Sequence, residues 1–244
     1  MEPWQQYGED LARVHDLGFG FHADRCQAGI LSLLEPVRHA GGLVLELGCG
    51  SGALTKYLIE AGHRVLATDA SPSMIERCRA NVGSAAEVRR LILPDDPLPE
   101  ADAVVSVGHV LSYLPDEASI NRALVAAAEA LRRGGVFAID LCDFRYGEAA
   151  GVGSHVARLA EDWAIISPIS LPSPSRLVRD ITTFVRGTDG AWRRSDERHV
   201  NVLIDTERVP ALLAAYGVDV TIGQAFGSET LPEGLATVVG FRRS

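Results

Sequence analysis

Short apolar runs alternate with amphipathic segments along residues 41–150. The runs that have the length of buried strands lie at residues 43–48, 63–69, 88–93, 102–107 and 135–141. The segments whose apolar residues recur at helical spacing lie at residues 52–61, 72–82 and 117–132. Alternating strands and helices are typical of a parallel sheet covered on both faces, so we predict an α/β fold with a doubly wound, mostly parallel sheet.

The chain on either side of this region has different patterns. Residues 1–40 are expected to be helical, with a new short segment beginning at Pro36. Residues 151–205 carry β-type runs separated by Pro-rich and Gly-rich turns, which predicts an antiparallel insertion of about three strands. A helix at 206–215 and two strands ending at Phe241 would complete a seven-stranded sheet. We therefore divide the chain into an N-terminal helical lid (1–40), a core (41–150), a small antiparallel cap over the substrate side (151–205) and a C-terminal completion of the sheet (206–244).

Composition narrows the class of protein. The 244 residues, with 47% hydrophobic content, suffice for one core with a small appendage. A formal net charge of −9 argues against a nucleic-acid substrate, which normally requires clustered Lys and Arg. The four cysteines show no C-x-x-C pairing, so we expect neither a metal site nor a disulfide framework. The polar N-terminus and the lack of a long apolar run predict a cytoplasmic protein with no membrane partner. We expect a monomer or a homodimer.

A glycine-rich turn follows the first apolar run. Gly48 and Gly50 let the backbone turn tightly and let a ligand approach the chain, while the N–H groups of the next helix face that ligand. The second apolar run ends in Asp69, 21 positions after Gly48. An acid at the tip of the second strand can accept hydrogen bonds from the ribose hydroxyls of a nucleoside. These residues predict a nucleoside site at the carboxyl edge of the sheet.

The acidic residue before the turn bears on the kind of nucleoside. Gly48, Gly50 and Ala53 also satisfy the dinucleotide fingerprint G-x-G-x-x-G/A, so the glycines alone leave a nicotinamide- or flavin-dependent enzyme open. Glu46 stands where a dinucleotide fold is expected to have an apolar residue, and a buried carboxylate needs a cation or several hydrogen bonds. S-adenosylmethionine carries an ammonium group and has no pyrophosphate, so it fits a turn that contains an acidic residue. The alternative is a solvated Glu at a strand end.

The glycine turn is part of an ordered set of motifs. The set consists of the E-x-G-x-G-x-G form beginning at Glu46, Asp69–Met74, Ala103–Ser106 and Leu131–Gly135. In order and spacing it resembles the motifs of Rossmann-like S-adenosylmethionine-dependent methyltransferases, over about residues 43–142. The stretches at 15–20 and 192–199 are similar, less specifically, to a small-molecule branch of that family.

The resemblance implies which residues hold the cofactor. Glu46 would hold the methionine ammonium, directly or through water, and Asp69 the ribose hydroxyls. The other residues expected at S-adenosylmethionine, and at the product S-adenosylhomocysteine, are Gly48, Cys49, Gly50, Ala70, Ser71, Met74, Leu93 and Gly108. The family often has an acid near the adenine amino group, where this chain has Leu91–Pro94. Adenine contacts there would come from backbone groups or from Asp95 or Asp96, which otherwise form a solvated loop.

Methyl transfer from a sulfonium releases a neutral thioether, so most of the rate can come from holding the acceptor in line with the methyl group. His109, after the fourth strand, is the candidate to take a proton from the acceptor or to orient it. Its alternative roles are a polar helix cap or a cofactor contact. Residues 106–113 lack the Asp/Asn-Pro-Pro-aromatic motif of N6-adenine methyltransferases, which argues against a nucleic-acid base as the acceptor.

The N-terminal segment has its own candidates. His15 with Asp16 would be a base with an orienting partner, or a cluster that closes a loop over the cofactor. Trp4 and Tyr7 would contact the sulfonium by a cation–π interaction, or anchor an amphipathic helix.

Four polar residues later in the chain are less specific. Of Asp140 and Asp143, at the carboxyl edge of the sheet, one is expected to face the acceptor and the other the solvent. Arg198 and His199 would face a polar acceptor or belong to the charged outer face of a strand.

The sequence thus predicts an S-adenosylmethionine-dependent methyltransferase that moves a methyl group to an oxygen or nitrogen of a small molecule by in-line displacement. Two alternatives stay open. One is an NAD(P)-dependent oxidoreductase, and the other is a module that binds S-adenosylmethionine without catalysis.

Overall fold

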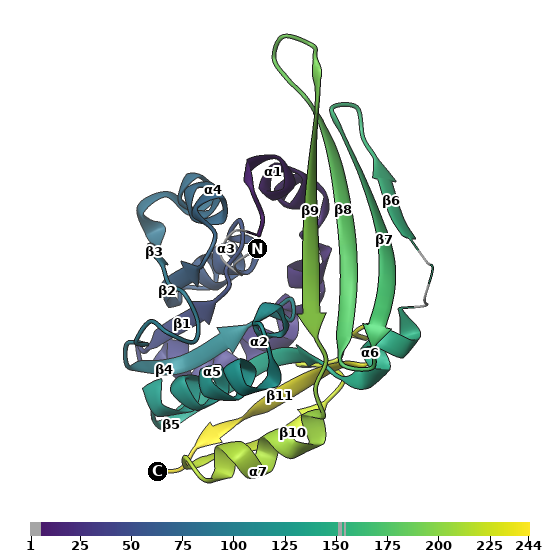
Figure 1. The fold of residues 1–244 in the computed structure, drawn as a ribbon. Coiled ribbons are helices and arrows are strands. Elements are labelled where there is room, and N and C mark those ends of the chain that lie inside the picture. Colours follow the sequence, from purple (N-terminus) through teal and green to yellow (C-terminus); the bar gives the residue numbers. More distant parts are fainter. Residues whose placement is uncertain (1–5, 151–152, 154) are drawn as a thin grey trace.

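The computed structural model describes residues 6–150, 153 and 155–244, and it contains two β-sheets (Figure 1). The strands of the seven-stranded sheet are, in spatial order, β10 (Val218–Gly223), β11 (Leu235–Arg242), β5 (Leu131–Cys142), β4 (Ala101–Ser106), β1 (Leu43–Leu47), β2 (Arg64–Asp69) and β3 (Glu87–Arg90). Neighbours from β5 to β3 are parallel, whereas β11 is antiparallel to both β5 and β10. The predicted doubly wound, mostly parallel sheet is therefore confirmed.

Helices cover both faces of this sheet, because its central strands are apolar on both faces. The helices are α1 (Glu9–Gly18), α2 (Phe21–His39), α3 (Ala53–Glu60), α4 (Pro72–Val82), α5 (Glu117–Ala130), α6 (Phe144–Ala149) and α7 (Val209–Ala214). Leu45 and Leu47 belong to a buried cluster with residues of α5 and α7. Val44, on the opposite face of β1, belongs to a second cluster with residues of α2, α3 and α4. Ligands of such folds bind at the carboxyl ends of the strands, where the next elements place the candidate residues.

The second sheet is antiparallel and stands beside the first (Figure 1). Its strands, in order, are β6 (His155–Leu159), β7 (Trp163–Ser173), β8 (Arg176–Arg186) and β9 (Trp192–Val202). It has four strands, whereas about three were predicted. The strand β6 was not predicted because it is an edge strand whose residues are all exposed and show no apolar alternation. β7 extends past Pro172, which lies at a register shift, a place where a strand tolerates proline.

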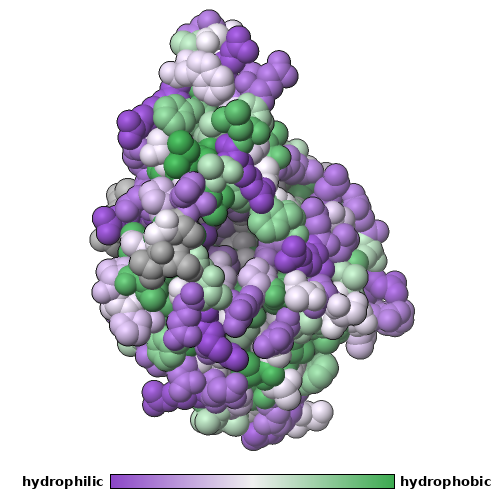
Figure 2. Space-filling model, turned by 90° about the vertical axis from the view of Figure 1, so that its right-hand side faces the viewer, coloured by the Kyte–Doolittle hydropathy of each residue, from purple (hydrophilic) through white to green (hydrophobic). Residues whose placement is uncertain are grey.

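The second sheet contributes to a narrow upper part of the molecule. α1 packs against α4 on one side and against β7 and β8 on the other, which joins the two sheets (Figure 1). Seen from the side of β6 and β7, the surface mixes hydrophilic and hydrophobic side chains and is hollowed near its middle (Figure 2). The inner face of this sheet therefore lies near the carboxyl edge of the first.

Several predicted boundaries were wrong. α2 continues through Pro36 to His39, because a proline in the last helical turn interrupts the hydrogen bonding only close to the end. α5 ends at Ala130, since Leu131 is extended and pairs with β4. The third strand stops at Arg90, so Leu91 and Leu93 leave the sheet and line a cavity instead.

Besides a 3₁₀ turn at Gly83–Ala85, two short elements had no sequence prediction. These are a 3₁₀ turn over Val110–Tyr113 and the helix α6. None of the helices in the described ranges combines the length and apolar character needed to span a membrane.

Candidate active site

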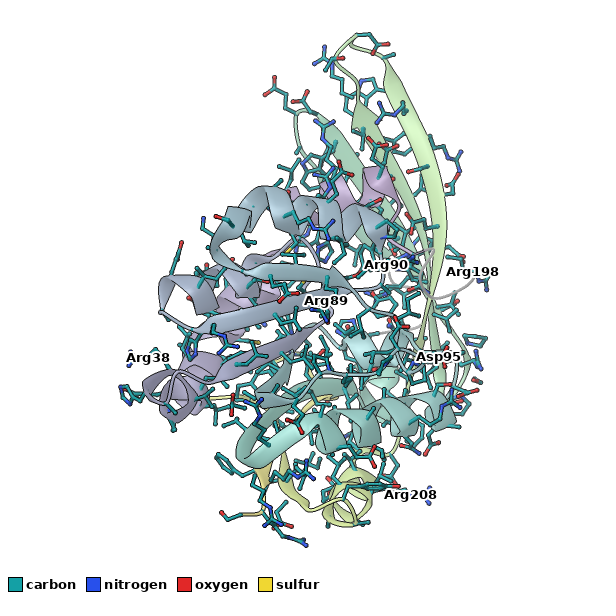
Figure 3. The ribbon with its side chains drawn as sticks, turned by 90° about the vertical axis from the view of Figure 1, so that its left-hand side faces the viewer. Arg38, Arg89, Arg90, Asp95, Arg198 and Arg208 are labelled. Carbon is teal, nitrogen blue, oxygen red and sulfur yellow. The ribbon has the colours of Figure 1, made fainter. Side chains whose placement is uncertain are left out.

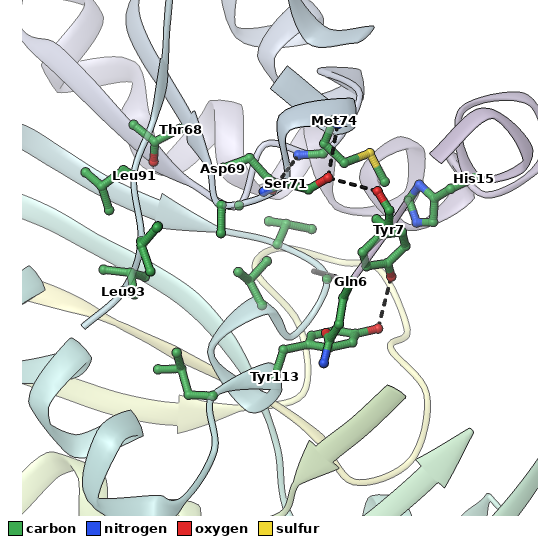
Figure 4. Close-up of a pocket in the computed structure, with 18 residues that line it drawn as sticks. Gln6, Tyr7, His15, Thr68, Asp69, Ser71, Met74, Leu91, Leu93 and Tyr113 are labelled. Carbon is green, nitrogen blue, oxygen red and sulfur yellow. Dashed lines mark hydrogen bonds between the residues drawn. The ribbon is translucent and has the colours of Figure 1, made fainter. Parts of the chain in front are cut away.

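A cavity of about 160 Å³ lies at the carboxyl ends of β1, β2 and β4 (Figure 4). Of the residues expected to contact the cofactor, those that line it are Gly48, Gly50, Asp69, Ala70, Ser71, Met74, Leu93 and Gly108. Glu46, Cys49 and His109 are not part of its wall. The glycine turn, the end of β2 and the start of α4 thus face one space, as expected for a nucleoside site.

The glycine turn is shaped by backbone conformations that favour glycine. Gly48 and Gly50 have φ values of 70° and 55°, in the left-handed region. A Cβ at Gly48 would collide with the side chain of Val110, so the turn packs directly against the segment after β4. Gly48, Gly50 and Val110 all line the cavity, so this contact forms part of its wall.

Asp69 ties the end of β2 to the glycine turn. Its carboxylate accepts hydrogen bonds from Gly50 N at 2.9 Å and from Ser71 N at 2.8 Å. Burial raises the pKa of Asp69, while the N–H groups of Ser71 and Gly50 lower it. Asp69 is thereby fixed in orientation at the cavity wall, where it can accept further hydrogen bonds.

Glu46 and Cys49 lie behind the wall of the cavity. Glu46 is only 2% exposed, and its Oε2 accepts a hydrogen bond of 2.7 Å from Thr55 Oγ1 on α3. Burial raises the pKa of Glu46 to about 7, opposed by the Thr55 hydrogen bond and increased further by Asp69. Cys49 is also buried, with its Sγ 3.6 Å from the Gly50 carbonyl oxygen. Glu46 is therefore a buried acid with no cation beside it among the described residues.

Tyr7 closes the cavity from the N-terminal segment. Its backbone oxygen accepts a hydrogen bond from Ser71 Oγ at 2.9 Å, and its hydroxyl lies 3.0 Å from that of Tyr113 (Figure 4). Its N–H, and that of Gly8, donate to the carboxylate of Glu197 on β9. Tyr7 has a φ of 58°, which is costly for a residue with a side chain. Trp4, the other predicted aromatic contact, lies outside the described residues.

His109 is held in a strained turn by Asp140. The fully buried carboxyl group of Asp140 accepts hydrogen bonds from Gly108 N at 3.0 Å and from His109 N at 2.6 Å. His109 has a φ of 50°, again in the left-handed region. His22 Nε2, from α2, lies 2.9 Å from Asp140 Oδ2 and joins the N-terminal helices to this turn. Asp140 therefore positions the residues after β4.

The His109 ring lies in a cluster of polar side chains. Its Nε2 is 3.3 Å from Nη2 of Arg179 on β8, and its ring stacks 5.8 Å from that of Tyr113. Burial, and next the charge of Arg179, lower the pKa of His109 to about 3. Burial likewise lowers the pKa of His15, which lines the cavity, to about 4. Both imidazoles are neutral at pH 7 and can each accept a proton or hydrogen bond.

The family described as "Methyltransferase domain" matches residues 44–135, which contain the glycine turn, Asp69 and the turn after β4. The ubiquinone biosynthesis O-methyltransferase of Methylobacterium sp. (strain 4-46) is 28% identical over 201 residues, 73% of this chain and 77% of that protein. The match extends well beyond the glycine turn, so it does not rest on the G-x-G-x-x-A pattern that oxidoreductases share.

Residues 44–135 of the chain therefore form a methyltransferase domain. Solved structures agree in fold. An S-adenosylmethionine-dependent methyltransferase from Clostridium acetobutylicum superimposes with a TM-score of 0.81 at 15% identity, covering 96% of this chain and 98% of that one. The sugar N-methyltransferase KedS8 from Streptoalloteichus sp. gives 0.72 at 22% identity, covering 95% and 91%. Both matches include the second sheet, because they cover nearly the whole chain.

For two acids, the structure contradicts one of the roles that the sequence suggested. Asp16 lies 3.7 Å from Arg77 and accepts a hydrogen bond from Asn81, and it has no hydrogen bond to His15 among the described residues. Asp143 does not face solvent, as it is 7% exposed and bonds to Thr206 Oγ1 at 2.7 Å.

The structure also distinguishes the alternative roles of the residues in the loop at 95–96 and on β9. Asp95 and Asp96 are exposed, and Asp96 accepts a hydrogen bond from Ile92 N, as in a solvated loop. Arg198 points outward from β9 (Figure 3), while the buried His199 bonds to Glu197. The two neighbouring residues of β9 therefore occupy opposite faces of the second sheet.

Four residues of the site had no role predicted from the sequence: Tyr113, Arg179, Glu197 and Asn201. Tyr113 lies in the segment after β4 that was singled out for His109. The position of Arg179 could have been predicted from the sequence. It lies two residues from each of the buried residues Leu177 and Ile181, so all three share the inner face of β8. Glu197 lies in the stretch 192–199, whose resemblance assigns it no role, and no local pattern marks Asn201.

Proposed function

We propose that this methyltransferase transfers the methyl group of S-adenosylmethionine to a nitrogen or oxygen of a small-molecule acceptor bound between the cavity and the inner face of the second sheet. One observation carries the proposal. The cavity that holds Asp69 and the glycine turn ends at Tyr7 and Tyr113, and directly beyond them lies a polar cluster with the neutral His109. A methyl group delivered at that end would meet hydrogen-bonding side chains that can orient an acceptor.

The cofactor residues follow from the same placement. Asp69 would bind the ribose hydroxyls, while Gly48, Gly50 and Gly108 would approach the amino-acid part of the cofactor. Ala70, Ser71, Met74 and Leu93 would line the adenine. Glu46 and Cys49 would act from behind the wall, Glu46 by receiving the cofactor ammonium directly or through water.

His109 would take a proton from the acceptor or orient it. A pKa of about 3 keeps His109 neutral across physiological pH but makes it a weak base, so this value favours the orienting role as long as the charge of Arg179 is not neutralised. Arg179 Nη2 can only donate to Nε2, so the neutral ring carries its hydrogen on Nδ1, which is buried, has no hydrogen-bond partner among the described residues and is free to donate to a ligand.

The proposed methyl acceptor is a small molecule. The net charge of −9 disfavours nucleic acid as the acceptor and thereby favours a small molecule. An amine is one candidate, since one structural relative is a sugar N-methyltransferase, and a hydroxyl is another, since one sequence relative is an O-methyltransferase.

A cytoplasmic location, and a monomer or homodimer, stay predictions. Fractionation and light scattering test them.

Calorimetric titration with S-adenosylmethionine, S-adenosylhomocysteine, NAD and NADP tests the cofactor. We expect micromolar binding of the first two alone. A methyl-transfer assay with radiolabelled cofactor then screens amino sugars, small amino acids and phenols. Dinucleotide binding would support an oxidoreductase instead, and cofactor binding with no turnover on any acceptor would support a non-catalytic module.

A further inference from the structure

Arg179 brings a permanent positive charge to the inner face of β8. Its guanidinium stays protonated at any physiological pH. Among the described residues, no carboxyl group lies within ion-pair distance of it. A half-buried guanidinium without a carboxylate is unfavourable, since burial removes part of its hydration.

The groups around Arg179 supply no compensating charge. Nη2 donates to Tyr113 Oη at 3.0 Å and to Asn201 Oδ1, and it lies 3.3 Å from His109 Nε2. Burial raises the pKa of two nearby phenols, Tyr7 and Tyr146, so neither is negative at pH 7. The charge of Arg179 is therefore surrounded by neutral partners.

The two acids that bond to His109 and to Tyr7 already have their own hydrogen-bond partners. Asp140 accepts hydrogen bonds from Gly108 N and His109 N and contacts His22. Glu197 accepts from Tyr7 N and Gly8 N and contacts His199. Both acids hold the backbone in place, so neither is free to neutralise Arg179.

The cluster also has donors without acceptors. Arg179 Nε is buried and has no hydrogen-bond partner among the described residues, and the three hydrogen bonds of the guanidinium all use Nη2. Asn201 is fully buried, and its Nδ2 has no partner there either. Buried donors are normally satisfied, so a group of unsatisfied donors beside a net positive charge is suited to an oxyanion.

This cluster lies at the acceptor end of the cavity. Tyr113 lines the cavity, and Arg179 bonds to its hydroxyl from the side of the second sheet. Because Arg179 and His109 are in contact, an anionic group held by Arg179 and a methylated atom near His109 could belong to the same small molecule.

We propose that Arg179, together with Asn201, binds an anionic group of the methyl acceptor, a carboxylate or a phosphate. The inference rests on the proposed function and adds the acceptor's charge to it. The methylated nitrogen or oxygen and the anion would lie on the same small molecule. Neutralisation of Arg179 by that anion would also make His109 a better proton acceptor.

Titration of small anions into the protein saturated with S-adenosylhomocysteine tests the proposal. The probes are sodium acetate, inorganic phosphate and the neutral acetamide, at constant ionic strength. We expect acetate or phosphate to bind the wild-type complex at least about tenfold more tightly than acetamide. Whichever of the two anions binds more tightly identifies the anion.

Variants assign the binding to Arg179. Arg179→Gln should weaken anion binding about tenfold or more, and Arg179→Lys, which keeps the charge, should retain part of it. Arg198→Gln removes an exposed arginine of β9 that points away from the site (Figure 3), so anion binding should be unchanged. All three variants should bind S-adenosylhomocysteine as the wild type does.

Three outcomes would overturn the inference: an absence of anion binding to the wild-type complex, equal binding to Arg179→Gln, or a loss of cofactor affinity in that variant. The last would assign Arg179 to the cofactor carboxylate. If Arg179→Gln does not fold, the acetate and acetamide titrations of the wild type, with Arg179→Lys, still decide. Failure of the wild type to bind S-adenosylhomocysteine would instead count against the proposed function.

Discussion

The two ends of the active site are built in different ways. The cofactor end is made from consecutive parts of the chain, and its main hydrogen bonds, such as Gly50 N to Asp69, join residues 19 positions apart. The acceptor end joins distant segments, as when Tyr7 N donates to Glu197, 190 positions away. The first is a local property of strand, turn and helix, whereas the second exists only once the second sheet and the N-terminal segment have packed.

The two ends also differ in charge and strain. The cofactor end has two acids, Glu46 and Asp69, which suit an ammonium group and ribose hydroxyls. The acceptor end has the cation Arg179 beside neutral imidazoles. Among the described residues, the non-glycine positions with positive φ are Tyr7 and His109, and both face this end. Strain of this kind is usually kept where it serves a site.

The largest effect is expected for Asp69→Ala at the cofactor end. The change removes an acceptor of charge-assisted hydrogen bonds, each worth about 1.5–3 kcal/mol, so two ribose hydroxyls lost should weaken S-adenosylmethionine binding about 1,000-fold. Calorimetry measures the affinity, and circular dichroism checks that the fold is retained. Asp95→Ala, on an exposed loop, removes the same charge and should bind normally. An unchanged affinity in Asp69→Ala would overturn the ribose assignment.

Glu46→Gln should stabilise the protein without cofactor at alkaline pH. The pKa of Glu46 is raised from 4.5 to about 7, so the folded state binds more protons than the unfolded state between these values. Stability therefore falls as pH rises from about 4.5 to 7, by about 3 kcal/mol in total, and stays reduced above pH 7. Glutamine keeps an oxygen for Thr55 and has no charge to desolvate.

Urea unfolding at pH 5 and pH 8 measures this effect. The difference in unfolding free energy between Glu46→Gln and the wild type should grow from pH 5 to pH 8. Glu60→Gln, on the exposed side of α3, should show no such growth. A constant difference for Glu46→Gln would mean that Glu46 does not titrate in this range.

The contrast between the two ends explains what the sequence could predict. The glycine turn, Asp69, Ser71 and Met74 lie on a regular strand–turn–helix unit, where spacing along the chain fixes spacing in space. The fold class followed from the same alternation, and the fold is confirmed. The cofactor residues themselves stay predictions, which binding measurements must test.

The acceptor end could not be predicted in the same way. Arg179 meets His109 only because β8 folds back over the turn after β4, and no local spacing records that meeting. β6 was missed because an edge strand exposed on both faces has no apolar alternation. Asp140 stood out at the end of β5, but its role in holding the His109 turn depends on a hydrogen bond across the sheet edge.

His109→Asn tests the acceptor end without disturbing its backbone. Asparagine tolerates the left-handed conformation better than most residues, so the strained turn at φ 50° should persist. Loss of the imidazole should lower kcat about 100-fold and leave S-adenosylmethionine affinity within about twofold. Single-turnover kinetics and calorimetry separate the two. Because the pKa of His109 is about 3, its loss should remove no inflection from the wild-type rate profile between pH 5 and 8. A collapse of cofactor binding would make His109 a cofactor residue.

The smallest effect is expected for Glu197→Gln, which loosens the link between the two ends. The charged acceptor for Tyr7 N and Gly8 N is lost, so the strained segment over the cavity should open more often. We expect cofactor affinity to fall about tenfold and amide exchange at Tyr7 and Gly8 to accelerate, as measured by calorimetry and hydrogen exchange. Asp196→Asn, one residue earlier on the opposite face of β9, bonds to Thr182 and Arg194 and should change neither. Faster exchange with unchanged affinity would show that Tyr7 covers the cavity without holding the cofactor, and the two ends would then bind their ligands independently.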